Sequence, residues 1–369
     1  MVQKSGNAVS TEAARLSVAI STWNRKDMVT QAIDSVIGQQ YEGLLEIVVV
    51  DDGSTDGTIR ELTARYAARN VPSNRRLVIH ANPHTGMTGT MGKGIELCSG
   101  DYVSMCDSDD LWEPARAAEL LAEVEKTPNA LIHTTCKMRM LDGFQLPNRA
   151  RRGSFEETDN LFDKLGYTPL EYPGNVTLYD WLLGQQWRGP RMRGSLAIFP
   201  RTFVQGEFAM PAGSLWQEVW LTFAAMVQGT IRYAGLNSYV QRIHGENDSL
   251  PGPSTSKGLD ITRGNLVFLE HAIPILRRHA GCDRSLLRRV ETRAHVDRYR
   301  LNVSAGLSLR EALKGVSLSD VLAEPRELLS YTLRAKAPAL HDFLSRTRQS
   351  LTGKGPAGQA RPSKPFDGR

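Results

Sequence analysis

The sequence has no apolar run long enough to cross a bilayer, for which about 20 consecutive apolar residues are needed. A secretory signal peptide is also missing, because the opening segment MVQKSGNAVSTEAARL has no apolar core. These two absences predict a cytoplasmic location. With 41% hydrophobic and 23% charged residues among 369, the composition is that of a globular protein with one large or two moderate domains.

Cysteine is scarce, and none of the four cysteines belongs to a C-x-x-C pair. This argues against a zinc ribbon and against a disulfide framework, both of which need closely spaced or numerous cysteines. Two of the cysteines lie among apolar residues of a predicted core. We therefore expect buried thiols, which is the ordinary state of a free cysteine in a globular protein. The four positions are Cys98, Cys106, Cys136 and Cys282.

The net charge of +5 is unevenly distributed along the chain. Between Thr262 and Thr352 there are 16 Lys and Arg against 9 Asp and Glu. Such an excess is typical of solvated helix faces, and it also suits an anionic membrane surface, an acidic partner or a nucleic acid. The sequence leaves these alternatives open.

Alternation of strand-like and helical patterns marks the first half of the chain. Short runs rich in β-branched residues predict strands at 16–22, 45–52, 76–82, 101–107 and 130–136. Apolar stripes at helical spacing predict helices at 25–40, 56–70 and 114–127. This alternation predicts an α/β fold with a Rossmann-like, mostly parallel central sheet flanked by helices. Ligands of such sheets bind beyond the carboxyl ends of the strands.

The second half is less regular and ends in helices. Residues 141–193 read as a long loop, which in a compact domain is usually functional or disordered. A strand at 195–201, a helix at 214–229 and a strand-like run at 231–244 follow, and then a linker at 248–258. Residues 262–352 have helical spacing and form a predicted helical appendage. We expect the following divisions: a disordered N-terminus at 1–14, subdomains at 15–140 and 141–250, a helical C-terminal region at 251–352, and a disordered tail at 353–369.

The segment MCDSDDLW (105–112) places three carboxylates within four residues at the end of a predicted strand. Carboxylates this close repel one another unless a cation or hydrogen-bond donors face them. Mg²⁺ and Mn²⁺ prefer oxygen ligands and usually take only one or two from the protein, which leaves positions for phosphate and water. We therefore expect a divalent cation that holds a diphosphate. A second acidic pair, Asp51-Asp52, ends another strand and leads into the turn GSTDGT, where it could bind the donors of a base or ribose.

Three segments, with their order and spacing, resemble the nucleotide-binding half of the inverting family 2 glycosyltransferases. They are LSVAISTWNRKDMVTQAIDSVIGQQYEGLLEIVVVDDGSTDGT, GKGIELCSGDYVSMCDSDD and the LWEP that follows it. The resemblance covers roughly residues 15–250 and implies the A-type fold of nucleotide-diphospho-sugar transferases. It implies that Thr22 and Asp52 contact the nucleoside, most often uridine. It further implies that Asp107 lies near the ribose and that Asp109 ligates the metal.

The resemblance extends to other residues of the predicted site. Family members often carry Glu-Asp-x-x-Leu on a helix beneath the acceptor, and here Glu218 of QEVWL takes the position of the catalytic Asp. The alternative is that Glu218 is a surface residue of an amphipathic helix. QRIHGENDS is similar to the family's Arg-x-His segment, which would offer Arg242 to the diphosphate and His244 to the metal. Family members frequently have Ala-Arg-Asn before Gly-Ile, whereas this chain has Met91-Gly92-Lys93 there, so the basic side chain is displaced by one position to Lys93. The expected donor site also includes Asn24, Arg25 and Ser108.

The sequence thus predicts a metal-dependent, inverting, hexosyltransferase-type glycosyltransferase that uses Mn²⁺ or Mg²⁺ and a nucleotide-diphosphate sugar, UDP-sugar above all. The acceptor stays open among a glycan, a lipid-linked sugar, a peptide, a natural product and a modified nucleic acid. One alternative is a nucleotidyltransferase, which usually has a glycine-rich basic loop where this chain has STWNRKDM. Another is a noncatalytic nucleotide-sugar-binding module, because Met91 and Glu218 depart from the family pattern. The C-terminal helices could dock on the catalytic domain, form a homo-oligomer, or associate peripherally with the inner face of a membrane.

Overall fold

The computed structural model describes residues 2–4, 15–141, 157–174, 177–182, 192–214, 217–245, 247, 257–279 and 282–337. The chain divides into two compact units, a first unit of residues 1–290 and a second unit of residues 291–369. Within the described ranges, every helix is too short or too polar to span a lipid bilayer.

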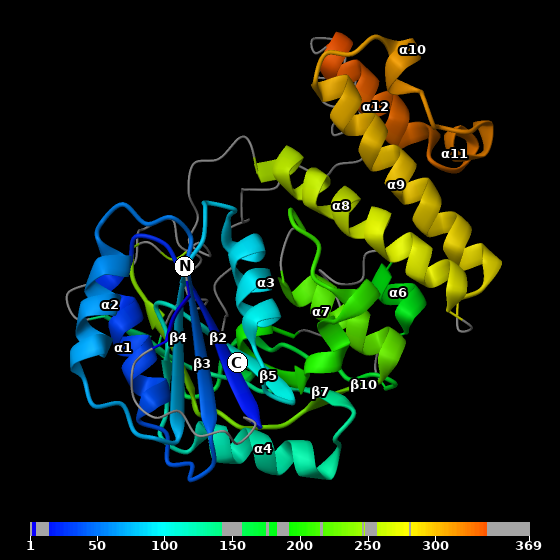
Figure 1. Cartoon of the computed structure of the whole chain (residues 1–369). Helices are drawn as coiled ribbons and strands as arrows, with labels where there is room; N and C mark the ends of the chain where they lie inside the picture. Colours follow the sequence, from blue (N-terminus) through cyan, green and yellow to red (C-terminus); the bar gives the residue numbers. More distant parts are fainter. Residues whose placement is uncertain are drawn as a thin grey trace, which may run out of the picture. The chain divides into compact units, whose positions relative to one another are not determined.

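A twisted β-sheet forms the centre of the first unit (Figure 1). In the described residues its strand order is β1-β4-β3-β2-β5-β9-β7-β10. The strands are β1 (Val2–Lys4), β2 (Leu16–Thr22), β3 (Leu45–Asp51), β4 (Arg75–Ala81), β5 (Tyr102–Asp107), β7 (Ala130–His133), β9 (Ala197–Pro200) and β10 (Thr230–Tyr233). Strands β4, β3, β2 and β5 are mutually parallel, whereas β9 runs antiparallel between β5 and β7. The predicted α/β class with a mostly parallel sheet is confirmed.

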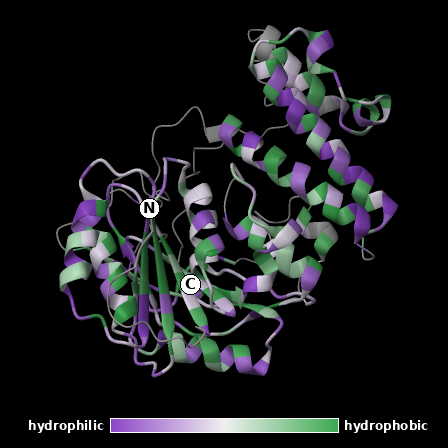
Figure 2. Ribbon diagram, viewed as in Figure 1, coloured by the Kyte–Doolittle hydropathy of each residue, from purple (hydrophilic) through white to green (hydrophobic). Residues whose placement is uncertain are grey.

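Helices cover both faces of this sheet (Figure 1). The described helices of the first unit that precede α9 are α1 (Lys26–Ile37), α2 (Thr58–Ala68), α3 (Met87–Leu97), α4 (Arg116–Lys126), α5 (Leu161–Leu165), α6 (Leu178–Leu182), α7 (Gln217–Gln228) and α8 (Lys257–Arg278), of which α8 packs against α7. Alternate residues of β2 and β3, such as Val18 and Ile47, form one core with α1, α2 and α4. On the other face α3 lies close to the strands, because a Cβ on Gly94 would meet Ala19 at 3.4 Å. The apolar colouring of the central strands in Figure 2 reflects this burial from both sides.

The first unit also contains a second sheet, which has three strands. It has the order β6-β11-β8, with β6 (Leu111–Trp112), β11 (Tyr239–Ile243) and β8 (Lys137–Met140). Strand β11 pairs antiparallel with β6, which directly follows the acidic segment, and parallel with β8. The pairing therefore brings the QRIH segment next to the acids, although more than a hundred residues separate the two in the sequence.

The second unit is helical in its described residues. Its elements are the C-terminal part of α9 (Arg284–Ser304), α10 (Leu309–Ala312), α11 (Leu318–Ala323) and α12 (Pro325–Lys336). A small core contains Val296, Tyr299, Val303, Ala312 and Leu328. Ser308 and Ser317 each close a capping box, with Glu311 and Asp320 as the reciprocal partners.

Several boundaries differ from the sequence-based expectation. Residues 2–4, predicted as disordered, pair as strand β1 with β4, because an edge strand of the sheet accepts a short partner. The run 130–136 ends its strand at His133 and a new strand begins at Lys137. The helical region expected at 251–352 falls across both units, since α8 packs within the first one through Phe268 against Trp220. The predicted tail at 353–369 and most of the predicted linker lie outside the described residues.

Candidate active site

Three polar residues end neighbouring strands at one edge of the main sheet. Thr22 ends β2, Asp51 ends β3 and Asp107 ends β5. The register pairs Thr22 with Asp51 and Ser21 with Asp107, so the acidic segments after β3 and β5 flank the end of β2. The carboxyl edge of a parallel sheet is where ligands of α/β folds bind. The predicted acids therefore converge at the expected edge.

Asp109 forms the centre of the acidic turn after β5. Its Oδ2 accepts a hydrogen bond from Arg25 Nη1 at 2.5 Å and lies 3.0 Å from His244 Nε2. Both Asp109 and His244 are buried, at 7% and 4% exposure. Burial by itself would raise the pKa of Asp109, but the His244 hydrogen bond and the Arg25 charge together hold that pKa below its usual value. The two residues predicted to ligate a metal thus meet in one place.

Asp110, the third acid, connects the turn to β11. Its Oδ2 accepts from the Tyr239 hydroxyl at 2.9 Å, and its Oδ1 accepts from the Arg242 amide at 2.9 Å. The same Tyr239 hydroxyl accepts from the Asp107 amide at 3.1 Å. Burial and the charges of the neighbouring acids raise the pKa of Asp110 well above its usual value. Both carboxylate oxygens of Asp110 therefore bind residues of β11 and hold the turn in shape.

Glu218 lies in the first turn of α7. A Cβ on Gly194 would lie 3.3 Å from Met105 of β5 and 3.5 Å from the Cβ of Glu218, so only a small residue lets these elements approach. Burial and the charge of Asp107 raise the pKa of Glu218, while the charge of Arg193 opposes them. Glu218 therefore lies within electrostatic reach of the acidic turn, and its environment is not that of a surface glutamate.

Arg193 is the cation between Glu218 and the acids. Its Nη1 donates to Gln241 Oε1 of β11 at 2.6 Å. The charges of Asp107 and Asp110 help to raise its pKa. Asp107 is also hydrogen-bonded by the Ser195 hydroxyl, and burial together with Asp109 raises the pKa of Asp107 to about 6. Arg193 was not predicted as a site residue.

Asp52 is engaged by the loop before α3. Its Oδ1 accepts from the Thr85 amide at 2.7 Å and its Oδ2 from the Gly86 amide at 2.9 Å, while His84 Nδ1 lies 2.9 Å from Oδ2. The turn at Gly53 has a φ of 73°, and a Cβ there would meet the His84 amide at 3.3 Å. Glycine thus allows the loop to reach Asp52.

An exposed aromatic side chain lies next to His84 of this loop. Trp23, which follows Thr22 directly, is 52% exposed, and its ring centroid lies 5.2 Å from that of His84. Beside it, the Thr22 Oγ1 and the Asp51 Oδ1 are buried and have no hydrogen-bond partner among the described residues. Trp23 was not predicted as a site residue; its position after the strand end was the available signal.

The remaining predicted residues have other partners in the structure. Asn24, with a φ of 51°, accepts from the Thr55 amide at 2.8 Å and so shapes the GSTDGT turn. The Arg242 guanidinium donates to the Asp109 carbonyl, to Gln31 of α1 and to the Met28 carbonyl. Ser108 is buried within the acidic turn. These contacts assign Asn24 and Arg242 a structural part, and their contact with a donor stays a prediction.

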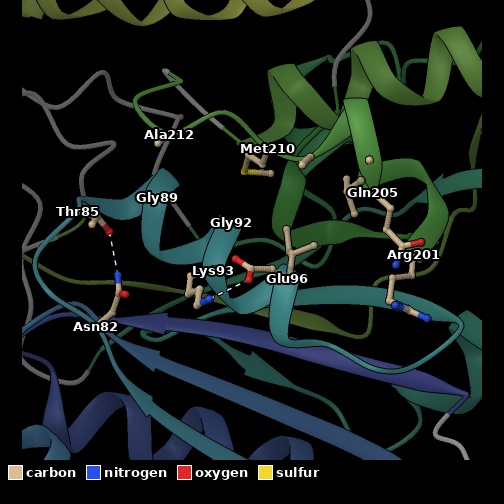
Figure 3. Close-up of a pocket in the computed structure, with 14 residues that line it drawn as sticks. Asn82, Thr85, Gly89, Gly92, Lys93, Glu96, Arg201, Gln205, Met210 and Ala212 are labelled. Atoms are coloured by element: carbon tan, nitrogen blue, oxygen red, sulfur yellow. Dashed lines mark hydrogen bonds and ion pairs between the residues drawn. The ribbon is translucent and has the colours of Figure 1, made fainter. Parts of the chain in front are cut away.

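Lys93 lies in a separate cavity along α3 (Figure 3). The cavity has a volume of about 600 Å³ and is lined by α3 and by residues of 201–212, including Arg201 and Met210. Lys93 Nζ pairs there with Glu96 at 2.9 Å. None of the acids of the turn lines this cavity. The structure therefore does not bring Lys93 together with the predicted metal ligands.

A metal site built only from protein is not found in the described residues, since no three His, Cys, Asp or Glu side chains there are grouped for it. Asp109 and His244 do supply one carboxylate and one imidazole at adjoining positions. Mg²⁺ and Mn²⁺ commonly take one or two protein ligands and fill the rest with phosphate oxygens and water. Asp109 and His244 would therefore suit such a cation if the oxygens of a bound diphosphate and water supplied the remaining ligands.

Comparison with known proteins agrees with the fold. Residues 17–176 match the model of glycosyl transferase family 2. The uncharacterized glycosyltransferase YibD of Escherichia coli is 27% identical over 68% of this chain and 67% of its own length. An uncharacterized glycosyltransferase of Nostoc is 23% identical over 66% and 69%. The crystal structure of S. aureus TarS 1-349 in complex with UDP-GlcNAc superposes with a TM-score of 0.54 at 15% identity, covering 96% of this chain and 99% of the other.

Residues 17–176 therefore match glycosyl transferase family 2, and the first unit has the A-type fold of nucleotide-diphospho-sugar transferases. The resemblance drawn from the sequence is confirmed at the level of family and fold.

Proposed function

We propose that the protein is a metal-dependent, inverting glycosyltransferase that transfers a hexose from a nucleotide-diphosphate sugar to an acceptor nucleophile. The observation that carries the proposal is the contact between Asp109 and His244 at the carboxyl edge of the sheet, with Glu218 close enough to the neighbouring Asp107 for its charge to act on Glu218. These residues come from three distant segments of the sequence. Asp109 and His244 have the chemistry to bind a cation that holds the diphosphate, and Glu218 has the chemistry of a general base.

The nucleoside of the donor is proposed to bind at the corner formed by Trp23, Thr22 and Asp51-Asp52. An exposed indole is suited to stacking on a base, and buried polar oxygens without a partner are costly unless a ligand satisfies them. The likeness to TarS, whose structure contains UDP-GlcNAc, supports a UDP-sugar as the first donor to test.

A bound Mn²⁺ or Mg²⁺ would neutralise the negative charge that grows on the departing nucleoside diphosphate. Asp109 and His244 are the proposed protein ligands. Arg25, which pairs with Asp109, and Arg193, whose charge couples to Asp107, would add fixed positive charge around the leaving group. Because this part of the site is buried, such charges act more strongly than they would in water.

Glu218 is the proposed general base. Its carboxylate would take the proton from the acceptor nucleophile while that atom attacks the anomeric carbon from the face opposite the diphosphate. The new bond forms as the bond to the diphosphate oxygen breaks, so a single displacement inverts the configuration. A base works best when its pKa approaches the working pH, and the raised pKa of Glu218 moves it in that direction.

Donor binding is the most direct test, because it does not require the acceptor. Thermal unfolding is measured with a panel of nucleotide sugars, with and without Mn²⁺. A ligand at a hundred times its Kd stabilises the folded state by about 2.7 kcal/mol, which is readily detected. We expect a UDP-sugar to stabilise the protein in a Mn²⁺-dependent way, and Asp109→Asn to lose that dependence.

The matched control is Asp260→Asn, which changes an exposed acid of α8 whose partner among the described residues is Arg263, at 3.4 Å. It should respond to donor and Mn²⁺ as the wild type does. If no nucleotide sugar stabilises the wild type, or if Asp109→Asn keeps the full Mn²⁺-dependent shift, the proposed donor site is wrong. If the protein is stabilised only by a nucleoside triphosphate combined with a sugar phosphate, and not by nucleotide sugars, the nucleotidyltransferase alternative is favoured.

A further inference from the structure

The carboxylate of Asp52 is saturated with hydrogen-bond donors from the loop before α3. A carboxylate offers about four lone-pair sites. Its Oδ1 accepts from the Thr85 amide at 2.7 Å and from the Thr85 hydroxyl at 3.3 Å. Its Oδ2 accepts from the Gly86 amide at 2.9 Å and lies 2.9 Å from His84 Nδ1. A ligand that donates a hydrogen bond to Asp52 therefore has to take the place of one of these donors.

His84 is the donor that can leave most easily. The amides of Thr85 and Gly86 belong to the backbone that leads into α3, and the Thr85 hydroxyl is also held by the Asn82 side chain at 3.1 Å. The His84 side chain is 58% exposed, so its imidazole can rotate into solvent without a change of the backbone. Its Nδ1 faces two oxygen acceptors, Asp52 Oδ2 and the Asp52 carbonyl oxygen at 3.1 Å, and therefore carries a hydrogen.

The same imidazole covers the exposed indole of Trp23. The two ring centroids lie 5.2 Å apart, with an angle of 36° between the ring planes. Trp23 is the residue on which the base of the donor is proposed to stack. A nucleobase with an N–H on its edge has the same two features as the imidazole, a flat ring and a donor in its plane. His84 therefore makes the two contacts that the proposed nucleoside site offers to a base.

We propose that His84 occupies the place of the nucleobase, and that the base of the nucleotide donor displaces it by stacking on Trp23 and donating an N–H to Asp52. This inference rests on the proposed function, because it concerns the same donor site. Uracil, whose ring nitrogen carries a hydrogen between two carbonyl groups, has the required edge. Separating His84 from Trp23 and Asp52 costs free energy, which lowers the affinity for the donor. Removal of the imidazole should therefore raise that affinity.

The experiment is isothermal titration calorimetry of the full chain with UDP in the presence of Mn²⁺. His84→Ala should bind UDP about fivefold more tightly than the wild type, because neither the ring contact with Trp23 nor the bond to Asp52 has to be broken. His84→Phe keeps a ring beside Trp23 but has no N–H, so its affinity should lie between the two. A residue that only supported the local structure would weaken binding when removed, so the direction of the change is diagnostic.

Two controls and one spectroscopic measurement isolate the role of the imidazole. Inorganic diphosphate has no base, so its Mn²⁺-dependent affinity should be the same for the wild type and for His84→Ala. His271→Ala removes an exposed imidazole of α8 whose Nδ1 lies 2.8 Å from the Val267 carbonyl oxygen, and it should bind UDP as the wild type does. In proton–nitrogen NMR spectra, the imidazole signals that are absent from His84→Ala should shift when UDP is added to the wild type.

Unchanged or weaker binding of UDP by His84→Ala would overturn the proposal, and so would an equal gain in affinity for UDP and for inorganic diphosphate. His84→Phe serves in the same way if His84→Ala loses its helical circular dichroism. If the wild type binds UDP and the His84 signals do not move, the imidazole is not displaced, and this inference fails while the proposed donor site stands. If neither the wild type nor His84→Ala binds any nucleoside diphosphate, the proposed donor site is wrong as well.

Discussion

Glu218 illustrates how one side chain gains its chemistry from its surroundings. The sequence gives only its place in a Gln-Glu-x-x-Leu run, which a solvent-facing helix could also contain. In the structure, the absence of a side chain at Gly194 lets α7 approach β5, and Glu218 becomes partly buried near Asp107. Burial then raises the pKa of Glu218. The residue's proposed role as a base rests on this position rather than on the motif.

The raised pKa of Glu218 predicts a pH dependence. The base is active only when ionised, so turnover should fall as the pH decreases through the pKa of Glu218, which lies above the ordinary glutamate value of about 4.3. The measurement is the pH profile of nucleoside diphosphate release at saturating donor. Arg193→Gln removes a charge that opposes the shift, so its acid limb should move to still higher pH. An acid limb that does not move in Arg193→Gln would contradict the electrostatic coupling.

Individual site residues differ in how far the sequence could predict them. Asp109 and His244 were predicted together because each lies in a recognisable segment, and the structure joins them at 3.0 Å. Arg193 and Trp23 were not assigned, because a single arginine in a long loop and a single aromatic after a strand have no spacing that signals a site. Lys93 was assigned to the donor by the resemblance; its side chain lines the cavity along α3 together with Thr85, whose amide binds Asp52, and its contact with a donor stays a prediction.

At the scale of elements, the acidic turn depends on β11. The Tyr239 hydroxyl joins the Asp110 carboxylate and the Asp107 amide, and the Tyr239 ring lies 5.1 Å from the buried Arg116 guanidinium. The turn is therefore held by a strand that follows it in the sequence by more than a hundred residues. Strand patterns predicted both segments, but local sequence does not encode which strands pair across such a distance.

This dependence predicts the effect of Tyr239→Phe. The substitution keeps the ring and removes the hydroxyl, which leaves a buried carboxylate oxygen of Asp110 without its donor and should cost about 1–3 kcal/mol of unfolding free energy. All six tryptophans lie in the first unit, so urea unfolding followed by tryptophan fluorescence reports on that unit alone. Tyr167→Phe, at a residue that is 39% exposed, should change stability by less than about 0.5 kcal/mol. Equal effects of the two substitutions would mean that β11 does not hold the turn.

The chain consists of a first unit with the A-type fold of nucleotide-diphospho-sugar transferases and a second unit that is helical in its described residues. The sequence predicted a change from strand–helix alternation to helices, and it placed that change near the linker at 248–258. The structure divides the units at 290, because α8 contributes Phe268 to an aromatic cluster with Trp181, Trp220 and Phe223. Helical periodicity reports that a segment is amphipathic, but not which domain its apolar face packs against.

Within the second unit, Asp320 predicts a pH-dependent stability. Burial would raise the pKa of Asp320, but hydrogen bonds from Ser317, Thr292 and His295 outweigh it and lower that pKa to about 2. A carboxyl group whose pKa is lower in the folded state stabilises the fold above its unfolded value of about 3.9, and this contribution disappears as the pH falls toward 2. Asp320→Asn should therefore lower the melting temperature of the second unit at pH 6 and differ little from the wild type near pH 2.

Calorimetry of the full chain measures this difference, and tryptophan fluorescence provides the internal control, because the unfolding of the first unit should not respond to Asp320→Asn. The stabilising contribution is expected to be about 1–2 kcal/mol after allowance for solvent screening. A difference between Asp320→Asn and wild type that is the same at pH 6 and at pH 2 would show that the hydrogen bonds do not depend on the charge of the carboxylate.

The central claim, catalysis of sugar transfer with Glu218 as the base, is tested most directly by nucleoside diphosphate release from the stabilising donor in the presence of Mn²⁺. We predict measurable release by the wild type and by Glu207→Gln, an exposed glutamate that pairs with Arg278. Glu218→Gln should bind the same donor with unchanged affinity and release the diphosphate about 10²-fold more slowly. Release by Glu218→Gln at the wild-type rate would contradict the assignment of the base, and donor binding by the wild type without any release would contradict catalysis itself.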